Sequence, residues 1–273
     1  EYGFINKYTY NTALYSIGCV NRQDSFPRET GYEEHQQTNW SMTFANNSKA
    51  SLTFHHPGNT GTHRYWCGDS GCFCNHLFGH ENVVMGVYFI PGNAGSFNFF
   101  HAYVPTNEFS EVVEQPESNR IFVRLGDAYA VLRFSSPYKW NSENSTKEVL
   151  VYDGEKRLNL RVGMVCEAGD KETYGSFEAF IAAMEKKEMV FDRDTLSLTY
   201  GDMQIKLDYT KSKRQPVEHN YLDGVEQEYP YANTYDSPYA KSVFDSGVIE
   251  VYCGGYVRTM DFMNVKDTTV KKK

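Results

Sequence analysis

The segment RIFVRLGDAYAVLRF, residues 120–134, decides the fold class. It consists of two runs of branched and aromatic residues, 120–125 and 127–134, separated at Gly126, a pattern typical of two strands joined by a tight turn. Similar runs recur along the chain with turn signals such as Pro57-Gly58, Pro91-Gly92 and Asp153-Gly154 between them. They predict further strands at residues 8–16, 37–44, 50–56, 83–90, 97–104, 148–152, 159–166, 195–200, 203–209, 248–252 and 256–262. Short strands without intervening helices favour an antiparallel sandwich.

One helix interrupts the strand pattern. Apolar residues follow the Gly175-Ser176 start signal at helical spacing, at positions 177, 180, 181 and 184. The fold class predicted is therefore mainly β, a large antiparallel β-sandwich with one short amphipathic helix near residues 177–187. We expect residues 1–210 to form the main sandwich. We expect residues 211–273 to add an extended segment and closing strands that pack on the same sandwich as one domain.

Composition excludes several classes of protein. The chain has 273 residues, of which 15% are aromatic, with 21 Tyr and 18 Phe against 3 Trp. This content excludes a disordered chain and argues against an all-α protein. The net charge of -8 and pI near 5.5 argue against a nucleic-acid partner. The longest apolar runs, 83–91 and 97–105, fall far short of the roughly 20 residues of a membrane helix, so no membrane span is expected.

The cysteines give little sign of a disulfide scaffold or a metal site. Six cysteines are too sparse for a scaffold in a chain of this length. Cys67, Cys72 and Cys74, followed by His76, do not match the paired spacing of zinc sites, so we expect no metal and no cofactor. Whether these three cysteines bind a metal stays open at this stage. The compartment is open as well, because the chain starts at Glu1 without Met: periplasmic, secreted and cytoplasmic bacterial locations all fit.

Histidines are concentrated in one part of the sequence. Seven of the eight lie between residues 35 and 101, where an even distribution would place about two, which favours a functional site there. His55 and His56 are consecutive at a strand end, so at most one of them points into a given cleft. His101 lies inside an aromatic strand, where a hydrogen-bonded core histidine is the alternative. Tyr65 and Trp66 lie in a Gly-rich loop and could either stack on sugar rings or anchor the loop.

Common catalytic motifs are absent from the sequence. It contains no nucleophile elbow, P-loop, dinucleotide fingerprint or H-E-x-x-H zinc motif. A glycosidase would need two carboxylates that face one cleft, and the sequence offers candidates without a geometry to choose among them. These candidates are Glu33, Glu34, Asp69, Glu81, Glu108 and Glu111.

An ordered series of short motifs resembles a known family. The series runs from Tyr8-Thr9-Tyr10 through Glu34-His35-Gln36-Gln37 with Trp40, His56-Pro57-Gly58 and Tyr65-Trp66 with Gly68. It continues with residues 101–105 (HAYVP), 126–132, 175–180 and 260–262. This order is similar to that in the C-terminal β-sandwich of bacterial proteins related to heparinase II/III and alginate-type polysaccharide lyases. The resemblance covers nearly the whole chain and implies a supersandwich-like fold.

The resemblance also implies a reaction and a partner. In such proteins an N-terminal helical toroid packs against the sandwich, and an anionic polysaccharide lies between them. The reaction is β-elimination at a uronate: a base takes the C5 proton, the carboxylate is stabilised, and an acid protonates the leaving oxygen. We therefore expect the toroid of the same protein and an anionic polysaccharide as partners. This chain is then the carbohydrate-facing portion of the enzyme, incomplete and inactive alone.

Carried onto this sequence, the resemblance implies a set of site residues. His56 and His101 would be catalytic, and Gln36 and Gln37 would hydrogen-bond a uronate carboxylate. The remaining substrate-binding residues would be Trp40, His55, Tyr65 and Trp66. If a toroid is the partner, the sandwich face that meets it should carry an exposed apolar patch.

Two alternatives stay open. The chain could be a non-catalytic sugar-binding or structural β module, or part of a toroid-plus-sandwich glycoside hydrolase. Hydrolysis leaves products without the conjugated double bond that elimination creates, so ultraviolet absorbance of the products separates the enzymes.

Overall fold

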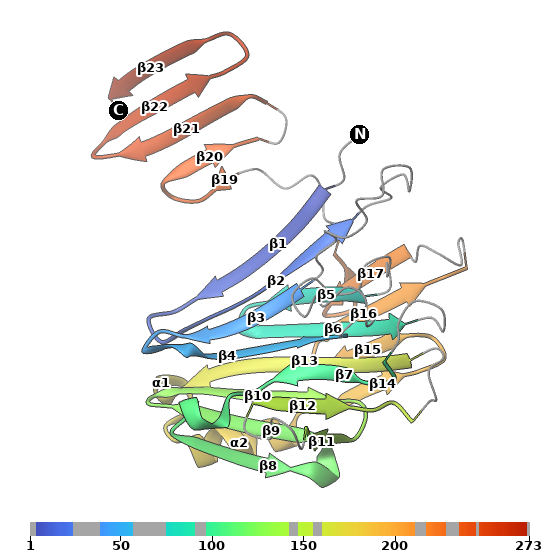
Figure 1. The fold of residues 1–273 in the computed structure, drawn as a ribbon. Helices are drawn as coiled ribbons and strands as arrows, with labels where there is room; N and C mark the ends of the chain where they lie inside the picture. The colour runs from blue at the N-terminus through green and yellow to red at the C-terminus, as the bar shows by residue number, and fades with distance from the viewer. Residues whose placement is uncertain are drawn as a thin grey trace. The chain divides into compact units, whose positions relative to one another are not determined.

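A computed structural model describes residues 4–23, 39–56, 75–90, 97–141, 147–154, 160–210, 217–227, 235–243 and 246–271. The chain is mainly β, with antiparallel sheets, as the sequence predicts (Figure 1). It divides into two compact units, Glu1–Glu226 and Gln227–Lys273.

The first layer of the first unit is a seven-stranded antiparallel sheet, here called the outer sheet. Residues along its strands point alternately inward and outward: Leu52 and Phe54 are buried in the core, whereas the alternating Ser51 and Thr53 are half-buried. In sheet order its strands are β1 (Phe4–Asn11), β2 (Tyr15–Gln23), β3 (Asn39–Phe44), β4 (Asn47–His55), β7 (Phe100–Tyr103), β12 (Glu148–Val151) and β11 (Tyr138–Trp140).

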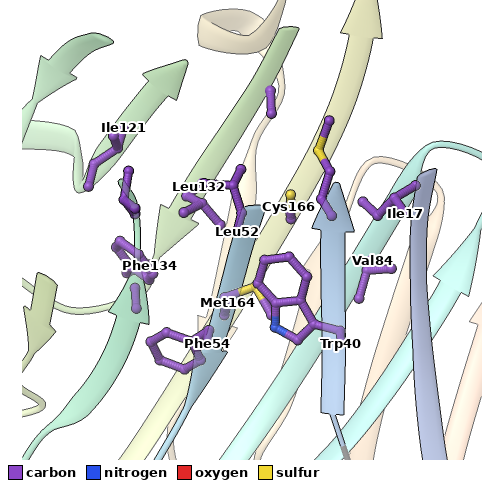
Figure 2. Close-up of a cluster of buried hydrophobic side chains, with 14 of the residues drawn as sticks. Ile17, Trp40, Leu52, Phe54, Val84, Ile121, Leu132, Phe134, Met164 and Cys166 are labelled. Carbon is purple, nitrogen blue, oxygen red and sulfur yellow. The ribbon is translucent and has the colours of Figure 1, made fainter. Parts of the chain in front are cut away.

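The second layer is a six-stranded antiparallel sheet, here called the central sheet. In order its strands are β5 (Asn75–His80), β6 (Val83–Ile90), β13 (Leu160–Asp170), β10 (Ala128–Phe134), β9 (Arg120–Leu125) and β8 (Glu111–Gln115). Every residue of β10 is buried, because both faces of this sheet are covered. On one face Leu132 and Met164 pack against Trp40, Leu52 and Phe54 of the outer sheet to form the main core (Figure 2).

The other face of the central sheet is covered in two parts. One part is a five-stranded sheet, here called the third sheet, whose Leu198 and Ile205 pack on Met85 and Val165. Its strands are β14 (Met189–Asp192), β15 (Ser197–Tyr200), β16 (Met203–Asp208), β17 (Val217–Leu222) and β18 (Val225–Glu226). The second part comprises the helices α1 (Lys171–Tyr174) and α2 (Phe177–Lys186). Figure 1 shows both helices beside the strands of the central sheet.

Helix α2 confirms the predicted amphipathic segment. Its buried residues are Phe177, Phe180 and Met184, which pack on Tyr129 of β10. The Ser176 side chain accepts a hydrogen bond from the Ala179 backbone N–H and so caps the helix.

Buried polar contacts join the third sheet to the central sheet. The Glu167 carboxylate, 1% exposed on β13, accepts a hydrogen bond of 2.6 Å from the Tyr200 hydroxyl and contacts the Lys187 ammonium at 2.5 Å. The His76 ring on β5 lies 2.9 Å from oxygens of both Asn220 and Glu218 on β17. These contacts fix how the layers stack, because a buried polar group without a partner is costly.

The structure also has elements that the sequence pattern did not predict. Residues 8–16 form a hairpin rather than one strand: the Thr12 hydroxyl accepts hydrogen bonds from the N–H groups of Leu14 and Tyr15, which builds a turn without Gly or Pro. In the first unit, the strands β5, β8, β11, β14, β17 and β18, the helix α1, and the short 3-10 helices η3 (Thr106–Glu108) and η4 (Pro116–Ser118) were not expected. In the second unit, the strands Tyr235–Asp236, Ala240–Ser242 and Lys266–Lys271 were not expected either.

The second unit is a five-stranded antiparallel sheet, with strands β19 (Tyr235–Asp236), β20 (Ala240–Ser242), β21 (Val248–Cys253), β22 (Tyr256–Asp261) and β23 (Lys266–Lys271). The first unit extends to Glu226, because β17 and β18 complete the third sheet.

Candidate functional site

The outward face of the outer sheet carries a groove of about 900 Å³. It opens over β4, β7 and β12, all in the first unit. Its lining residues are Asn39, Ser48, Lys49, Ser51, Thr53, His55, Phe97, Phe99, His101, Tyr103, Asn107, Glu108, Asn141, Lys147, Glu148 and Leu150.

Strand alternation and register place the histidines in this groove. Phe54 and Phe100 point into the core, so the residues next to them, His55 and His101, point outward. The antiparallel register sets these two histidines directly opposite each other across β4 and β7. Their ring centroids lie 5.3 Å apart, and the rings are inclined by 63°.

Burial affects the protonation of His55. The residue is 7% exposed, and the loss of hydration, with the charges of His101 and His56 as smaller contributions, lowers the pKa of His55 to about 3. At neutral pH this side chain is therefore a neutral imidazole, which can donate a hydrogen bond from one nitrogen and accept one at the other.

His101 has an acidic neighbour. Its Nε2 lies 3.4 Å from Oε2 of Glu148 on β12, and the same oxygen accepts a hydrogen bond of 2.9 Å from the Asn141 side chain. A carboxylate in this place orients an imidazole and stabilises the imidazolium that forms when the ring takes up a proton. Glu148 thus lies where it can orient the His101 ring.

The two ends of the groove differ in chemistry. Lys49, Lys147 and Glu108 lie toward one end, where the Asn47 amide donates a 2.9 Å hydrogen bond to the Glu108 carboxylate. Phe97 and Phe99 lie toward the other end, before β7 begins. The histidine pair lies between the charged end and the aromatic end.

The structure separates the residues that the sequence singled out. His55 and His101 meet in the groove. His56 is fully buried and faces the other way, where its Nε2–H donates to the Phe97 carbonyl oxygen at 3.1 Å. Trp40 is 2% exposed in the main core, so its ring has no face open to a ligand (Figure 2). These placements correct two expectations: His56 does not line the groove, and Trp40 is a core residue.

Four predicted site residues, Gln36, Gln37, Tyr65 and Trp66, lie outside the described residues, as do Cys67, Cys72 and Cys74. Within the described ranges, no three His, Cys, Asp or Glu side chains are arranged to hold a metal ion. Within the same ranges, neither helix is long and apolar enough to cross a membrane.

Sequence reasoning missed Glu148 and Lys147. The alternation of β12 places Glu148 and Leu150 on the outward face, a signal that was present in the sequence. It does not reveal that β12 pairs with β7, which brings Glu148 opposite Tyr103.

Exposed large apolar side chains are distributed unevenly among the described residues. In the first unit they are Val190 and Val225, neither of which lines the groove. The others, Tyr239, Val243, Tyr256, Phe262, Met263, Val265 and Val270, belong to the second unit. The apolar patch expected for a toroid partner is thus not found on the described outward face of the outer sheet.

A comparison of the sequence with protein-family models finds no match. A comparison with curated proteins finds no match either.

Proposed function

We propose that the outer groove binds a uronic-acid-containing polysaccharide. In this proposal the chain is the carbohydrate-facing β-sandwich portion of a polysaccharide lyase-like protein. The observation that carries the proposal is the groove itself, in which an imidazole–carboxylate pair, a neutral imidazole, two lysines and several aromatic rings lie together. The family resemblance supports the same assignment.

Each step of β-elimination has a counterpart in these residues. The base takes the C5 proton, the C–H electrons form the C4–C5 double bond, and the C4–O bond breaks as its oxygen leaves and is protonated. We assign His101 to the proton transfer at C5, with Glu148 as the residue that positions it. The neutral His55 donates a hydrogen bond to the substrate, and Lys49 and Lys147 attract uronate carboxylates.

In the same proposal, a residue of the helical toroid that the resemblance implies is the acid that protonates the leaving oxygen. Full activity then requires that partner. A net charge of -8 opposes an anionic ligand over long distances, so binding depends on the local lysines of the groove.

The test is turnover by the intact protein on an alginate-type polymer, followed by the ultraviolet absorbance of the new double bond. We expect His101→Gln to abolish turnover and to leave binding within about threefold. His219→Gln is a matched control, because it removes the histidine of another histidine–glutamate pair, His219–Glu226, on the third sheet. Unchanged turnover in His101→Gln would contradict the assignment, and products without the absorbance would indicate a glycoside hydrolase.

The second candidate is a non-catalytic sugar-binding module. The observation that favours it is the low exposure of both imidazoles, 7% for His55 and 8% for His101, which restricts their access to a sugar carbon. Binding by the intact protein without any turnover would support this candidate.

A further inference from the structure

The aromatic end of the groove has features of a ligand-binding subsite. Positions 97, 99, 101 and 103 all carry rings, and all four rings line the groove. Phe97 and Phe99 are half-buried residues of the groove lining, so each keeps part of its surface accessible there. Apolar rings that remain in contact with water beside polar side chains are typical of a ligand site, since a ligand that covers them gains hydrophobic free energy.

The rings of Phe97 and Phe99 are held in place by contacts with each other and with a neighbouring aromatic ring. The centroids of Phe97 and Phe99 lie 5.3 Å apart with a tilt of 53°, and Phe99 lies 5.8 Å from Tyr152 at 55°. The Lys139 ammonium lies 4.8 Å from the centre of the Tyr152 ring. This chain of contacts limits the movement of Phe99, so that binding a ligand there costs little side-chain entropy.

His56 holds the backbone of this platform. Its Nε2–H donates to the Phe97 carbonyl oxygen at 3.1 Å, and its ring packs edge-on against Phe100 with centroids 5.5 Å apart. The side chain is 0% exposed, so it does not touch a ligand in the groove. It joins the end of β4 to the segment just before β7.

We propose that Phe97 and Phe99 form a stacking subsite for the apolar face of a pyranose ring, next to the histidine pair, and that His56 is the positioning residue of this subsite. The inference rests on the proposed function, because it assigns a place to one sugar of the polysaccharide. A pyranose ring presents C–H groups on its faces, which pack on the π-face of an aromatic side chain. The carboxylates of neighbouring sugars then lie toward Lys49 and Lys147 at the charged end.

The test is calorimetric binding of a mannuronic acid hexasaccharide to the full chain. We expect Phe99→Ala to weaken binding about fivefold to tenfold and Phe99→Tyr to stay within about twofold, because tyrosine keeps the ring face. His56→Leu should weaken binding to a similar extent. His56→Gln should restore it, because the glutamine amide can donate to the same carbonyl; a residue that serves only to fill the core would not be rescued by a polar amide.

Thermal unfolding of each variant shows whether it is folded, and Phe97→Ala replaces His56→Leu if that variant does not fold. Normal binding by both Phe97→Ala and Phe99→Ala, while Lys147→Gln weakens it, would overturn the subsite and leave the proposed function standing. If the unmodified chain does not bind the hexasaccharide, or if Lys147→Gln and Phe99→Ala both bind normally, the proposed function is overturned together with the subsite.

Discussion

The buried histidine of the groove should make the stability of the protein depend on pH. The pKa of His55 is about 3 in the folded protein and 6.5 as the ordinary value of the unfolded chain. Below pH 6.5 the unfolded state therefore binds a proton that the folded state does not accept. The free energy of unfolding is therefore unaffected by this group above pH 6.5 and falls as the pH is lowered from 6.5 toward 3.

The size of the effect follows from these two pKa values. Between pH 7 and pH 5 the unfolded chain gains most of one proton at this site, which lowers the free energy of unfolding by about 2 kcal/mol. Substituting His55→Gln removes the titrating group and keeps a hydrogen-bonding side chain in the same place. Between pH 7 and pH 5 the free energy of unfolding of the variant should therefore fall by about 2 kcal/mol less than that of the unmodified protein.

Urea unfolding at several pH values measures this difference, with tryptophan fluorescence as the readout because Trp40 is buried in the main core. His219→Gln, on the third sheet, controls for the removal of a histidine outside the groove. Parallel pH profiles for His55→Gln and the unmodified protein would refute the reasoning, since they would mean that His55 takes up its proton equally in both states.

Three further predictions concern the layers that support the groove, and urea unfolding measures each of them. Glu167→Gln should lower the free energy of unfolding by about 1–3 kcal/mol, because it removes the charge that Lys187 contacts at 2.5 Å. The control Glu172→Gln, at an exposed position on α1, should change it by less than about 0.5 kcal/mol, and equal effects of the two variants would contradict this account. Gly163→Ala should lower the free energy of unfolding by about 1–3 kcal/mol, because the added Cβ would lie 2.9 Å from a ring carbon of Phe191 on the third sheet. A variant as stable as the unmodified protein would mean that the central and third sheets can move apart there. Ser176→Ala should cost about 1 kcal/mol through the loss of the α2 cap, with Ser176→Asp as a variant that should retain stability.

Local sequence patterns predicted much of this fold. The hairpin of residues 120–134 was predictable because both strands are rich in branched and aromatic residues and a Gly at a positive φ joins them. The helix was predictable because its apolar positions repeat at helical spacing. Strands that are polar along their length, such as Lys266–Lys271, carry no comparable signal, because a strand whose residues are all exposed needs no apolar pattern.

The candidate site was only partly predictable, because its geometry depends on nonlocal pairing. Alternation predicts that His55 and His56 face opposite ways, and the structure confirms it. Which of them faces the groove depends on which side of β4 the core covers. The pairing of β4 with β7 joins residues separated by more than forty positions, and β12 then brings Glu148 beside His101. No short motif encodes these two pairings.

The most direct test of the central claim, that the outer groove binds a uronate polymer, is the retardation of the chain in a native gel that contains this polymer. One double variant replaces Lys49 and Lys147 in the groove by Gln, and its control replaces the exposed Lys171 and Lys186 of the helices, so both carry the same net charge. We predict that the groove variant loses retardation and that the helix variant keeps it. Equal retardation of the two variants, or none for the unmodified chain, would contradict the claim.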